Sequence, residues 1–268
     1  MPAIALVGAT GRMGRAVVCA ADEYPQAHIT GASASAHSRH LGKDIGVLAG
    51  RPALGVAVAS EFALALKGAD VAIDFALADG VEERARMIST AGCAWVLGST
   101  GLSARQREAI DLASTRIAVI ASPNMSLAVQ LLMRLVDAAA RALPPEFDIE
   151  IHESHHRDKV DAPSGTARRL GEIAAAARGI APGDPAGSIR SASTGPRTPD
   201  TIGFSVARGG DLVGEHRVVF AGLGEQLVLE HRAADRMAFA RGALSAALWL
   251  SGRPAGRYEM SDVGSGKQ

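Results

Sequence analysis

The residues best suited to chemistry lie together in one segment, HESHHRDKVDAPSGTA, from His152 to Ala167. His155 and His156 are adjacent, and Lys159 follows three residues later. A histidine can donate or accept a proton near neutral pH, and a lysine is a strong point charge that can lose its proton when it is buried. The group as a whole suits a dianionic substrate whose reacting carbon must gain or lose a proton.

The end of this segment predicts a helix that begins at an anion-binding site. Pro163 fixes the backbone, and Ser164 is the expected N-cap. Gly165 and Thr166 then supply the first free N–H groups of the helix, and such an opening binds a carboxylate readily. We therefore expect this helix start to hold a carboxylate of the substrate.

A metal site and a purely structural role are the alternatives for the segment. A metal would use His152, His155 and His156, but this set lacks a cysteine, and Lys159 would repel a cation. Glu153 would also point away from His152 on a strand. A structural role would bury charged groups without partners, which is costly. We therefore favour a catalytic site without a metal.

A glycine-rich turn near residue 10 predicts a dinucleotide site. A buried apolar run leads into GATGRMG, Gly8 to Gly14, and then into a helical stretch. Gly11 lets the backbone approach a pyrophosphate, Gly14 lets the helix pack on the strand, and the helix N-terminus supplies N–H groups. The alternative is a tight turn without a ligand. The cofactor contacts expected here are Gly8, Ala9, Thr10, Gly11, Arg12 and Met13.

The stretch after the second expected strand bears on which cofactor binds. GASASAHSRH, Gly31 to His40, contains no acid that could hold an adenosine ribose. Four side chains there could instead receive a 2′-phosphate, with help from Arg12; the alternative is a solvated polar loop. They are Ser33, Ser35, His37 and Arg39. We expect NADPH to be preferred, with NADH possible.

Two further strand ends carry small polar residues. Ligands of doubly wound folds bind at the carboxyl ends of strands, so both segments are expected near the nicotinamide. Thr100 and Asn124 could meet its carboxamide, or either could cap a helix, Ser103 being the stronger cap. The contacts expected from these segments are Gly98, Ser99, Thr100, Ser122, Pro123, Asn124 and Met125.

The first half of the chain alternates apolar runs with helical stretches. Continuous apolarity is typical of strands covered on both faces, as in a parallel sheet. Strands are expected at Ala3–Ala9, His28–Ala32, Leu54–Ala59, Val71–Ala76, Ala94–Ser99 and Ile117–Ser122. Helices are expected at Arg12–Asp22, Asp79–Ala91 and Ser103–Ser114. This pattern predicts a Rossmann-like doubly wound α/β domain.

The second half predicts a smaller α+β domain with an open sheet. We expect helices at Ser126–Leu143 and Gly165–Arg178, a strand at Phe147–Glu153, a loop at Ile180–Thr201, and strands at Ile202–Arg208, Leu212–Gly222 and Glu225–Ala233 joined as hairpins. A last helix, Asp235–Leu250, is expected to pack on the first domain. The predicted domains are 1–125 with 236–268 for the dinucleotide, and 126–235 for substrate and oligomerisation. Exposed sheet edges favour a homo-oligomer.

The composition argues against several classes of partner. Lys and Arg number 28, as do Asp and Glu, so no global field attracts nucleic acid or an anionic membrane. No apolar run reaches about 18 residues, so we expect no membrane span. Cys19 and Cys93 show no metal-type spacing and are expected to be reduced, as in the cytoplasm. Ala3–Val7 is expected to be a strand rather than part of a signal peptide.

Several of these motifs together resemble the dihydrodipicolinate reductase family of the diaminopimelate–lysine pathway. They are GATGRMG, the turn Gly98–Gly101, the segment Ser122–Ser126, ESHHRDKVDAPSGTA, IGFSVARGGDLVGEH and DRMAFARGALSAALWL. The resemblance covers nearly the whole chain. It implies a cytoplasmic homotetramer that reduces 4-hydroxy-tetrahydrodipicolinate, a small dicarboxylate, with NADPH or NADH.

The resemblance also implies residue roles. His155 falls at the catalytic acid/base and Lys159 at a second proton donor. His156, Gly165 and Thr166 fall on substrate-carboxylate contacts. The chain departs from the family pattern with Ser35 in place of an acid, Ala76 in place of a threonine and Gln130 in place of an asparagine. Only the first departure bears on the cofactor.

Two other functions remain open from the sequence. One is a different Rossmann reductase of imino or keto diacids, similar to aspartate dehydrogenase, which would turn over a linear keto diacid. The other is a regulator that senses NADPH without chemistry. A regulator has no need of His155 or Lys159, so a coupled assay discriminates it from an enzyme.

Overall fold

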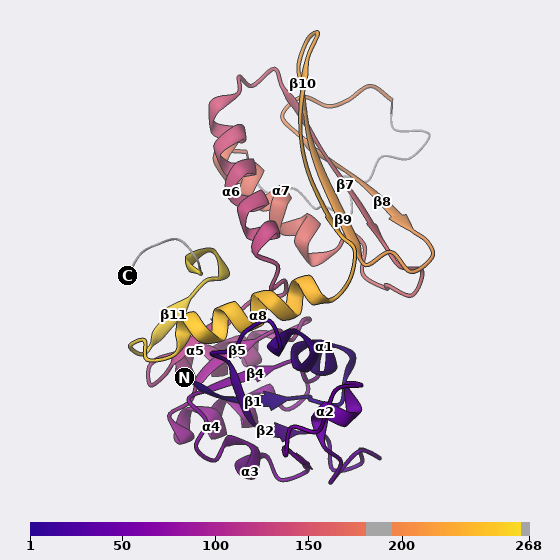
Figure 1. Cartoon of the computed structure of the whole chain (residues 1–268). Helices are drawn as coiled ribbons and strands as arrows, with labels where there is room; N and C mark the ends of the chain where they lie inside the picture. Colours follow the sequence, from indigo (N-terminus) through magenta and orange to yellow (C-terminus); the bar gives the residue numbers. More distant parts are fainter. Residues whose placement is uncertain (181–194, 264–268) are drawn as a thin grey trace. The chain divides into compact units, whose positions relative to one another are not determined.

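The protein was analysed as a computed structural model, which describes residues 1–180 and 195–263. The described residues form two compact units, Met1–Leu127 with the residues from Arg236 onward, and Ala128–Asp235 (Figure 1). Most of the loop expected at Ile180–Thr201 lies outside the described residues, and residues 195–201 contain no helix or strand.

The first unit contains a parallel sheet of seven strands in the order β11-β6-β5-β4-β1-β2-β3. The strands are β1 (Ala3–Val7), β2 (His28–Ser33), β3 (Val58–Ala59), β4 (Val71–Asp74), β5 (Ala94–Leu97), β6 (Ala118–Ala121) and β11 (Gly256–Tyr258). The helices are α1 (Arg12–Ala21), α2 (Ile45–Leu48), α3 (Phe62–Leu66), α4 (Val81–Ala91), α5 (Ala104–Ser114) and α8 (Met237–Leu250), with a 3-10 turn at Met260–Asp262.

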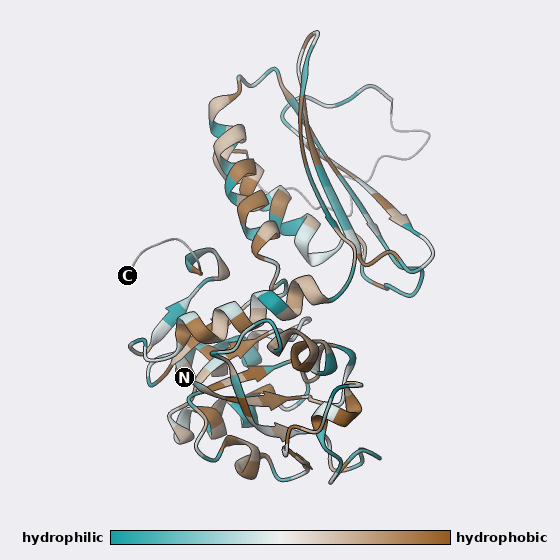
Figure 2. Ribbon diagram, viewed as in Figure 1, coloured by the Kyte–Doolittle hydropathy of each residue, from teal (hydrophilic) through white to brown (hydrophobic). Residues whose placement is uncertain are grey.

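Both faces of this sheet are buried, which explains why its strands are continuously apolar. Ile4 and Leu6 of β1 pack with residues of α1 and α8, whereas Ala5 and Val7 pack with residues of α4 and α5. Figure 2 shows the central strands as mostly hydrophobic. The predicted doubly wound α/β architecture is therefore confirmed, and α8 belongs to this unit as expected.

The second unit contains a mixed sheet of four strands in the order β10-β9-β7-β8. The strands are β7 (Asp148–His155), β8 (Ile202–Arg208), β9 (Gly214–Ala221) and β10 (Gln226–Ala233), and the helices are α6 (Leu127–Ala142) and α7 (Gly165–Arg178). Every second residue of β7, from Ile149 to His155, is buried, while Asp148 and His152 on the other face are exposed. The buried face of the sheet packs with α6 and α7 in one core.

One predicted connection in this unit is wrong. The sequence predicts a hairpin between β8 and β9, but β8 pairs in parallel with β7, and β9 pairs antiparallel with the opposite side of β7. The reason is α7, which joins β7 to β8 as a helical crossover and packs against the sheet. The hairpin between β9 and β10 is confirmed, with Ala221 opposite Gln226.

Short elements were missed or overextended in the sequence analysis. α2, α3, β11 and the 3-10 turn were not predicted, and the third predicted strand is reduced to Val58–Ala59. Among the described residues, no helix is both long and apolar enough to cross a membrane. Cys19 and Cys93 are both free thiols.

Candidate active site

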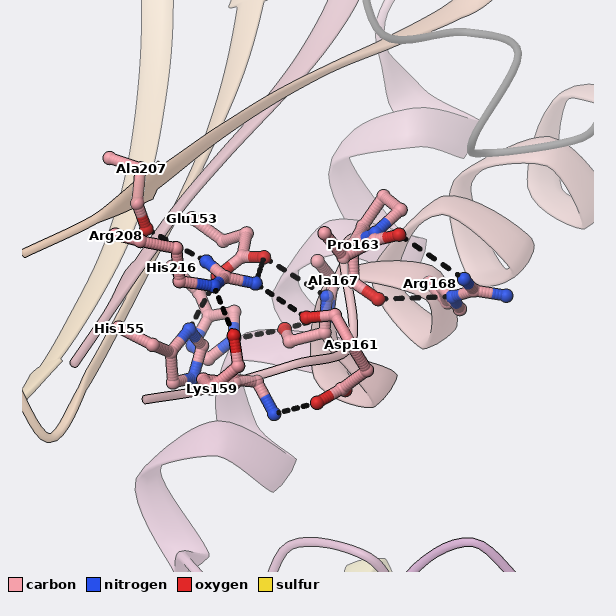
Figure 3. A network of polar contacts seen from close by, with 12 residues as sticks. Glu153, His155, Lys159, Asp161, Pro163, Ala167, Arg168, Ala207, Arg208 and His216 are labelled. Carbon is pink, nitrogen blue, oxygen red and sulfur yellow. Dashed lines mark hydrogen bonds and ion pairs between the residues drawn. The ribbon is translucent and has the colours of Figure 1, made fainter. Parts of the chain in front are cut away.

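β7 directs Glu153 and His155 into the buried side of the second unit, because residues two apart on a strand share a face. Glu153 is 2% exposed and His155 is 9% exposed. Nδ1 of His155 forms a hydrogen bond with Oε2 of Glu153 (Figure 3). The strand thus converts an i, i+2 spacing into a buried histidine–carboxylate pair.

The carboxylate of Glu153 is surrounded by donors. Arg208 at the end of β8 donates from Nη2 to Oε1 at 2.8 Å and from Nη1 to Oε2 at 3.0 Å. The backbone N–H of Ser164 donates to Oε1 at 3.0 Å. Burial alone raises the pKa of Glu153, but the hydrogen bonds from His155 and Arg208 outweigh it and lower the pKa to about 2. Glu153 is therefore an anion at neutral pH.

Arg208 also holds the loop that carries Lys159. Its Nη2 donates to the carbonyl of Asp161 at 2.6 Å and its Nε donates to the carbonyl of Lys159 at 3.3 Å. Nζ of Lys159 donates to Oδ1 of Asp161 at 2.7 Å. Burial raises the pKa of Asp161, but this hydrogen bond, the charge of Lys159 and the charge of Arg208 together outweigh burial, so the pKa is lowered. One guanidinium therefore fixes both the carboxylate beside His155 and the lysine loop.

His216 on β9 completes the cluster. Its ring centroid lies 5.2 Å from that of His155, and its Nε2 lies 3.1 Å from Oγ of Ser164. Burial, together with the nearby charge of His155, lowers the pKa of His216 to about 3. His216 is therefore neutral at physiological pH and is not a proton donor there.

The predicted anion-binding helix start is formed by α7. Oγ of Ser164 accepts a hydrogen bond from the N–H of Ala167 at 3.2 Å, which confirms the predicted cap. Gly165 is exposed, with open space where a Cβ would lie, and Thr166 is 8% exposed. His156 is half-buried at the end of β7. The structure thus places the predicted substrate residues directly after β7 and on the first turn of α7.

Acid is expected to destabilise the fold through two buried groups. The pKa of Glu153 is 4.5 when unfolded and about 2 when folded, so its contribution to stability is full above pH 4.5 and is lost towards pH 2. The pKa of His216 is 6.5 when unfolded and about 3 when folded, so its contribution is lost from pH 6.5 towards 3. At about 1.4 kcal/mol per unit, the free energy of unfolding should fall by on the order of 4 kcal/mol between pH 7 and 4.

Urea unfolding at both pH values and one protein concentration measures this loss. Most of it comes from His216, so the variant His216→Gln should lose on the order of 3 kcal/mol less than the wild type over the same interval. An equal loss in the two proteins would contradict the assignment of the acid sensitivity to His216.

The predicted cofactor segments meet at one edge of the first unit's sheet. They follow the carboxyl ends of β1, β5 and β6. Oγ of Ser99 donates to the carbonyl of Ala76 at 2.6 Å, and the N–H of Ser122 donates to the carbonyl of Leu97 at 3.0 Å. Oδ1 of Asn124 accepts from the N–H of Ser126 at 2.9 Å, so this side chain orders the backbone just before α6 begins at Leu127.

The other predicted residues of this edge differ in exposure. Thr100 and Pro123 are exposed, whereas Met125 is 2% exposed and packs in the core. Ser103, rather than Thr100, caps α5, since its Oγ accepts from the N–H of Gln106 at 3.2 Å. Side chains at Thr100 and Pro123 are therefore free to meet a ligand without disturbing the fold.

The glycine turn and an adjacent cavity fit a dinucleotide. Gly8 has a φ of +72°, and a Cβ there would lie 2.8 Å from the backbone nitrogen of Ala76. Gly11 is the N-cap of α1 and has no side chain to occupy the helix N-terminus. A cavity of 540 Å³ opens beside the turn and is lined by Gly8, Ser33 and Ser35. This volume lies within the usual range for ligand sites, about 300–1,000 Å³.

Arg84, which the sequence analysis missed, shapes the far wall of this cavity. Its Nε donates to the buried Asp74 at 2.7 Å. Its Nη2 and Nη1 donate to the carbonyls of Leu77 and Asp79, both at 2.8 Å. Arg84 thereby fixes the loop after β4, which lines the cavity together with Glu83. In the sequence, the contact between Arg84 and Asp74 is indicated only by their positions: Asp74 ends β4, and Arg84 lies one turn inside α4.

Substituting Gly14 is expected to weaken both the fold and cofactor binding. A Cβ at Gly14 would lie 2.5 Å from the carbonyl oxygen of Ala9 and 2.6 Å from that of Gly8. Gly14→Ala must therefore push the turn away from α1, at about 1–3 kcal/mol. Thermal unfolding and a fluorescence titration with NADPH should show a lower Tm and a higher Kd. Gly256→Ala is the matched control, because its nearest contact would be an ordinary 3.5 Å; equal effects in both would contradict the assignment.

The structure separates the histidines of the alternative metal site. His152 is exposed and hydrogen-bonds Ser205, whereas His155 is buried on the opposite face of β7. Within residues 1–180 and 195–263, no group of three or more His, Cys, Asp or Glu side chains is arranged to hold a metal ion. From the sequence, Glu153 was expected only to point away from His152, and its pairing with His155 two residues later was not predicted.

A doubly wound sheet with a glycine turn at its carboxyl edge defines a Rossmann-type oxidoreductase that uses a pyridine nucleotide. The second unit contains a buried histidine–carboxylate pair, a combination that is chemically able to take up or release a proton. Residues 2–125 match the family described as "Dihydrodipicolinate reductase, N-terminus", and residues 128–263 match "Dihydrodipicolinate reductase, C-terminus". The chain belongs to the dihydrodipicolinate reductase family, and the resemblance seen in the sequence is confirmed.

Curated relatives and a solved structure agree with this assignment. The chain is 46% identical over 263 residues to the 4-hydroxy-tetrahydrodipicolinate reductase of Anaeromyxobacter dehalogenans (strain 2CP-1), covering 98% of this chain and 97% of that one. It is 44% identical to the reductase of the same name from Ruegeria sp. (strain TM1040), with the same coverage. A dipicolinate-bound dihydrodipicolinate reductase from Paenisporosarcina sp. TG-14 has the same fold, with a TM-score of 0.75, 23% identity and 97% coverage of both chains.

Proposed function

We propose that this chain reduces 4-hydroxy-tetrahydrodipicolinate to tetrahydrodipicolinate as a step of lysine and diaminopimelate biosynthesis. The observation that carries the proposal is the buried Glu153–His155 pair in a chain 46% identical over 98% of its length to a reductase of that name. The reaction takes up one hydride and one proton and releases one water. The bound nicotinamide cofactor supplies the hydride, and the protein supplies the proton.

The second unit provides the groups for proton transfer and substrate binding. His155 donates the proton from Nε2, and Lys159 acts as a second proton donor and an anchoring charge. His156 and the N–H groups of Gly165 and Thr166 bind the substrate carboxylates. The open helix start of α7 and the position of Lys159 in the network around Arg208 support these roles.

The first unit binds the cofactor along the edge at which its parallel strands end. The proposed contacts are Gly8, Ala9, Thr10, Gly11, Arg12, Met13, Gly98, Ser99, Thr100, Ser122, Pro123, Asn124 and Met125. Residues 1–125 with 236–268 form the dinucleotide-binding domain of this proposal, and residues 126–235 form the substrate-binding and oligomerisation domain.

NADPH is the preferred cofactor in this proposal, and NADH is a weaker one. Ser33 and Ser35 line the cavity beside the glycine turn, and no acid follows β2 before Asp44. Burial lowers the pKa of His40, and the nearby cations Arg39, Lys43 and Arg15 lower it further. Positive charge is therefore concentrated around His40, in the segment that follows β2. Such a field favours a 2′-phosphate over a ribose hydroxyl.

A cytoplasmic homotetramer is the proposed state of the enzyme. The face of the four-stranded sheet that bears Asp148 and His152 is exposed, and β10 is an edge strand whose Leu227 is 39% exposed. Association of such faces would cover them. Light scattering measures the oligomer size.

A coupled assay with freshly made pathway intermediate tests the proposal. Consumption of NADPH that depends on this intermediate, with a higher kcat/KM for NADPH than for NADH, is the expected result. Absence of turnover, or turnover only of a linear keto diacid such as oxaloacetate with ammonia, would overturn the proposed reaction. A higher kcat/KM for NADH would overturn the cofactor preference alone.

A further inference from the structure

Glu153 is a buried anion for which the proposed reaction names no role. We propose that Glu153 is a positioning residue, which fixes the proton of His155 on Nδ1 and leaves Nε2 to face the substrate, and that Arg208 holds Glu153 in place. The inference rests on the proposed function, in which His155 donates the proton. It assigns the residues that make this histidine competent to do so.

The hydrogen bonds around Glu153 determine the tautomer of His155. An ionised carboxylate accepts hydrogen bonds only, so the contact between Oε2 and Nδ1 requires a hydrogen on Nδ1. The other contacts of this carboxylate, from Arg208 at 2.8 Å and 3.0 Å and from Ser164 at 3.0 Å, keep it ionised and oriented. Arg208 binds both carboxylate oxygens, so the carboxylate plane cannot turn away from the imidazole.

The second ring nitrogen of His155 is left available. A Cβ built on Gly214, the first residue of β9, would lie 3.1 Å from Nε2. The absence of a side chain at this position therefore preserves the space beside Nε2. Within residues 128–180 and 195–235, Nε2 forms no hydrogen bond, so the ring is held by Nδ1 and by the edge contact with His216.

The charges that face His155 come from each element around it. Glu153 on β7 is an anion whose charge Arg208 on β8 balances, and Lys159 and Asp161 of the following loop form their own ion pair. His216 on β9 is neutral, because its pKa is lowered to about 3. Among the residues that the structure describes, Glu153 is thus the one anion in direct contact with the imidazole. It stabilises the imidazolium before proton donation and aligns the ring afterwards.

Glu153→Gln tests the role of the charge. A glutamine amide has the shape of the carboxylate, but it can donate to Nδ1 and so place the proton on the wrong nitrogen. We expect kcat to fall by about 10–100-fold with little change in KM for substrate. A loss of this size is typical when the group that hydrogen-bonds and orients a functional histidine is removed. The alkaline limb of the kcat profile should move to lower pH. Glu153→Asp, which keeps the charge, should keep the wild-type limb and recover part of kcat.

Nitrogen-15 NMR of the histidine rings provides a readout that does not require turnover. The wild type should show the Nδ1–H tautomer for His155, identified by loss of its signals in His155→Ala. Glu153→Gln should show a mixture or the Nε2–H tautomer. A wild-type tautomer together with a wild-type pH profile would overturn the proposal. A fully active His155→Ala enzyme would instead overturn the donor assignment of the proposed function, and the NMR result would still decide whether Glu153 sets the tautomer.

Matched variants separate positioning from folding. Glu150→Gln makes the same change on the same strand, at a glutamate paired with Arg197 rather than with a histidine, and should leave kcat unchanged. A fall in kcat of the same size in Glu150→Gln would overturn the proposal. In a His155→Ala background, Glu153→Gln should produce no further loss of kcat, whereas an additive loss would also overturn it.

Folding of Glu153→Gln is expected, because Arg208 retains its carbonyl acceptors on Lys159 and Asp161. Should the variant be insoluble, Arg208→Lys provides the second measurement. A lysine cannot bind both carboxylate oxygens and the loop carbonyls at once. We therefore expect kcat and the alkaline limb of its pH profile to change in the same direction as in Glu153→Gln, but by smaller amounts. Wild-type values of both in Arg208→Lys would overturn the role of Arg208.

Discussion

His155→Ala is expected to lower kcat by about 10²–10⁴-fold, the usual contribution of a positioned general acid. The variant lacks Nε2 of His155, the nitrogen of a ring that Glu153 orients through Nδ1 and beside which Gly214 leaves space. The Kd for NADPH should stay close to the wild-type value, because every proposed cofactor contact lies outside residues 128–235. Steady-state kinetics at saturating substrate and a fluorescence titration with NADPH measure the two quantities.

The matched control for this variant is His28→Ala. His28 is exposed at the first residue of β2, the end of the strand opposite to the glycine turn. Its removal should leave both quantities unchanged. Full activity of His155→Ala would refute the proton-donor assignment, and a raised Kd for NADPH would indicate a wider disturbance of the fold.

Lys159→Ala is expected to lower kcat/KM by about 10²–10³-fold, mainly through KM. Its ammonium is a half-buried cation paired with Asp161 at 2.7 Å, with the side chain 21% exposed. Removing a half-buried charge that anchors a substrate carboxylate costs about 2–5 kcal/mol of binding, and each 1.36 kcal/mol is tenfold. The variant also leaves Asp161 as an uncompensated anion, which would repel a dicarboxylate.

Initial rates over a range of substrate concentrations measure this effect. Lys159→Arg, which retains the charge, should recover part of the substrate affinity, although it lacks the geometry of the ammonium. Lys67→Ala, at an exposed lysine after α3, is the control for a lost surface charge. Unchanged saturation by the substrate in Lys159→Ala would count against the anchoring role.

The sequence predicted the first unit well because its local patterns and its tertiary packing agree. The apolar runs of β1, β4 and β5 are continuous because helices cover both faces of the sheet. The sequence did not predict the pairing of β8 with β7. The long connection through α7 contains no local sequence signal that indicates which strand β8 pairs with. β11 was missed for a similar reason, as three residues of Gly-Arg-Tyr acquire a strand conformation only by pairing with β6.

The candidate site was predicted in part. His155 and Lys159 stand out because their residue types are rare in such a cluster, and the cap at Ser164 follows a local rule. Arg208 and His216 lie more than 50 residues from His155 in sequence, so only the tertiary fold brings them to it. Glu153 could have been found from its i, i+2 spacing to His155, but a lone glutamate on a strand is usually exposed.

The first unit is split in sequence by the second, and this affects the order in which the chain can fold during synthesis. Residues of α8, among them Ala243, Leu244 and Ala247, fill one face of the main sheet, and β11 pairs with β6. The ribosome makes both elements after the whole of the second unit. Until they emerge, the nascent sheet of the first unit presents an uncovered apolar face, so the second unit is expected to reach its native packing first.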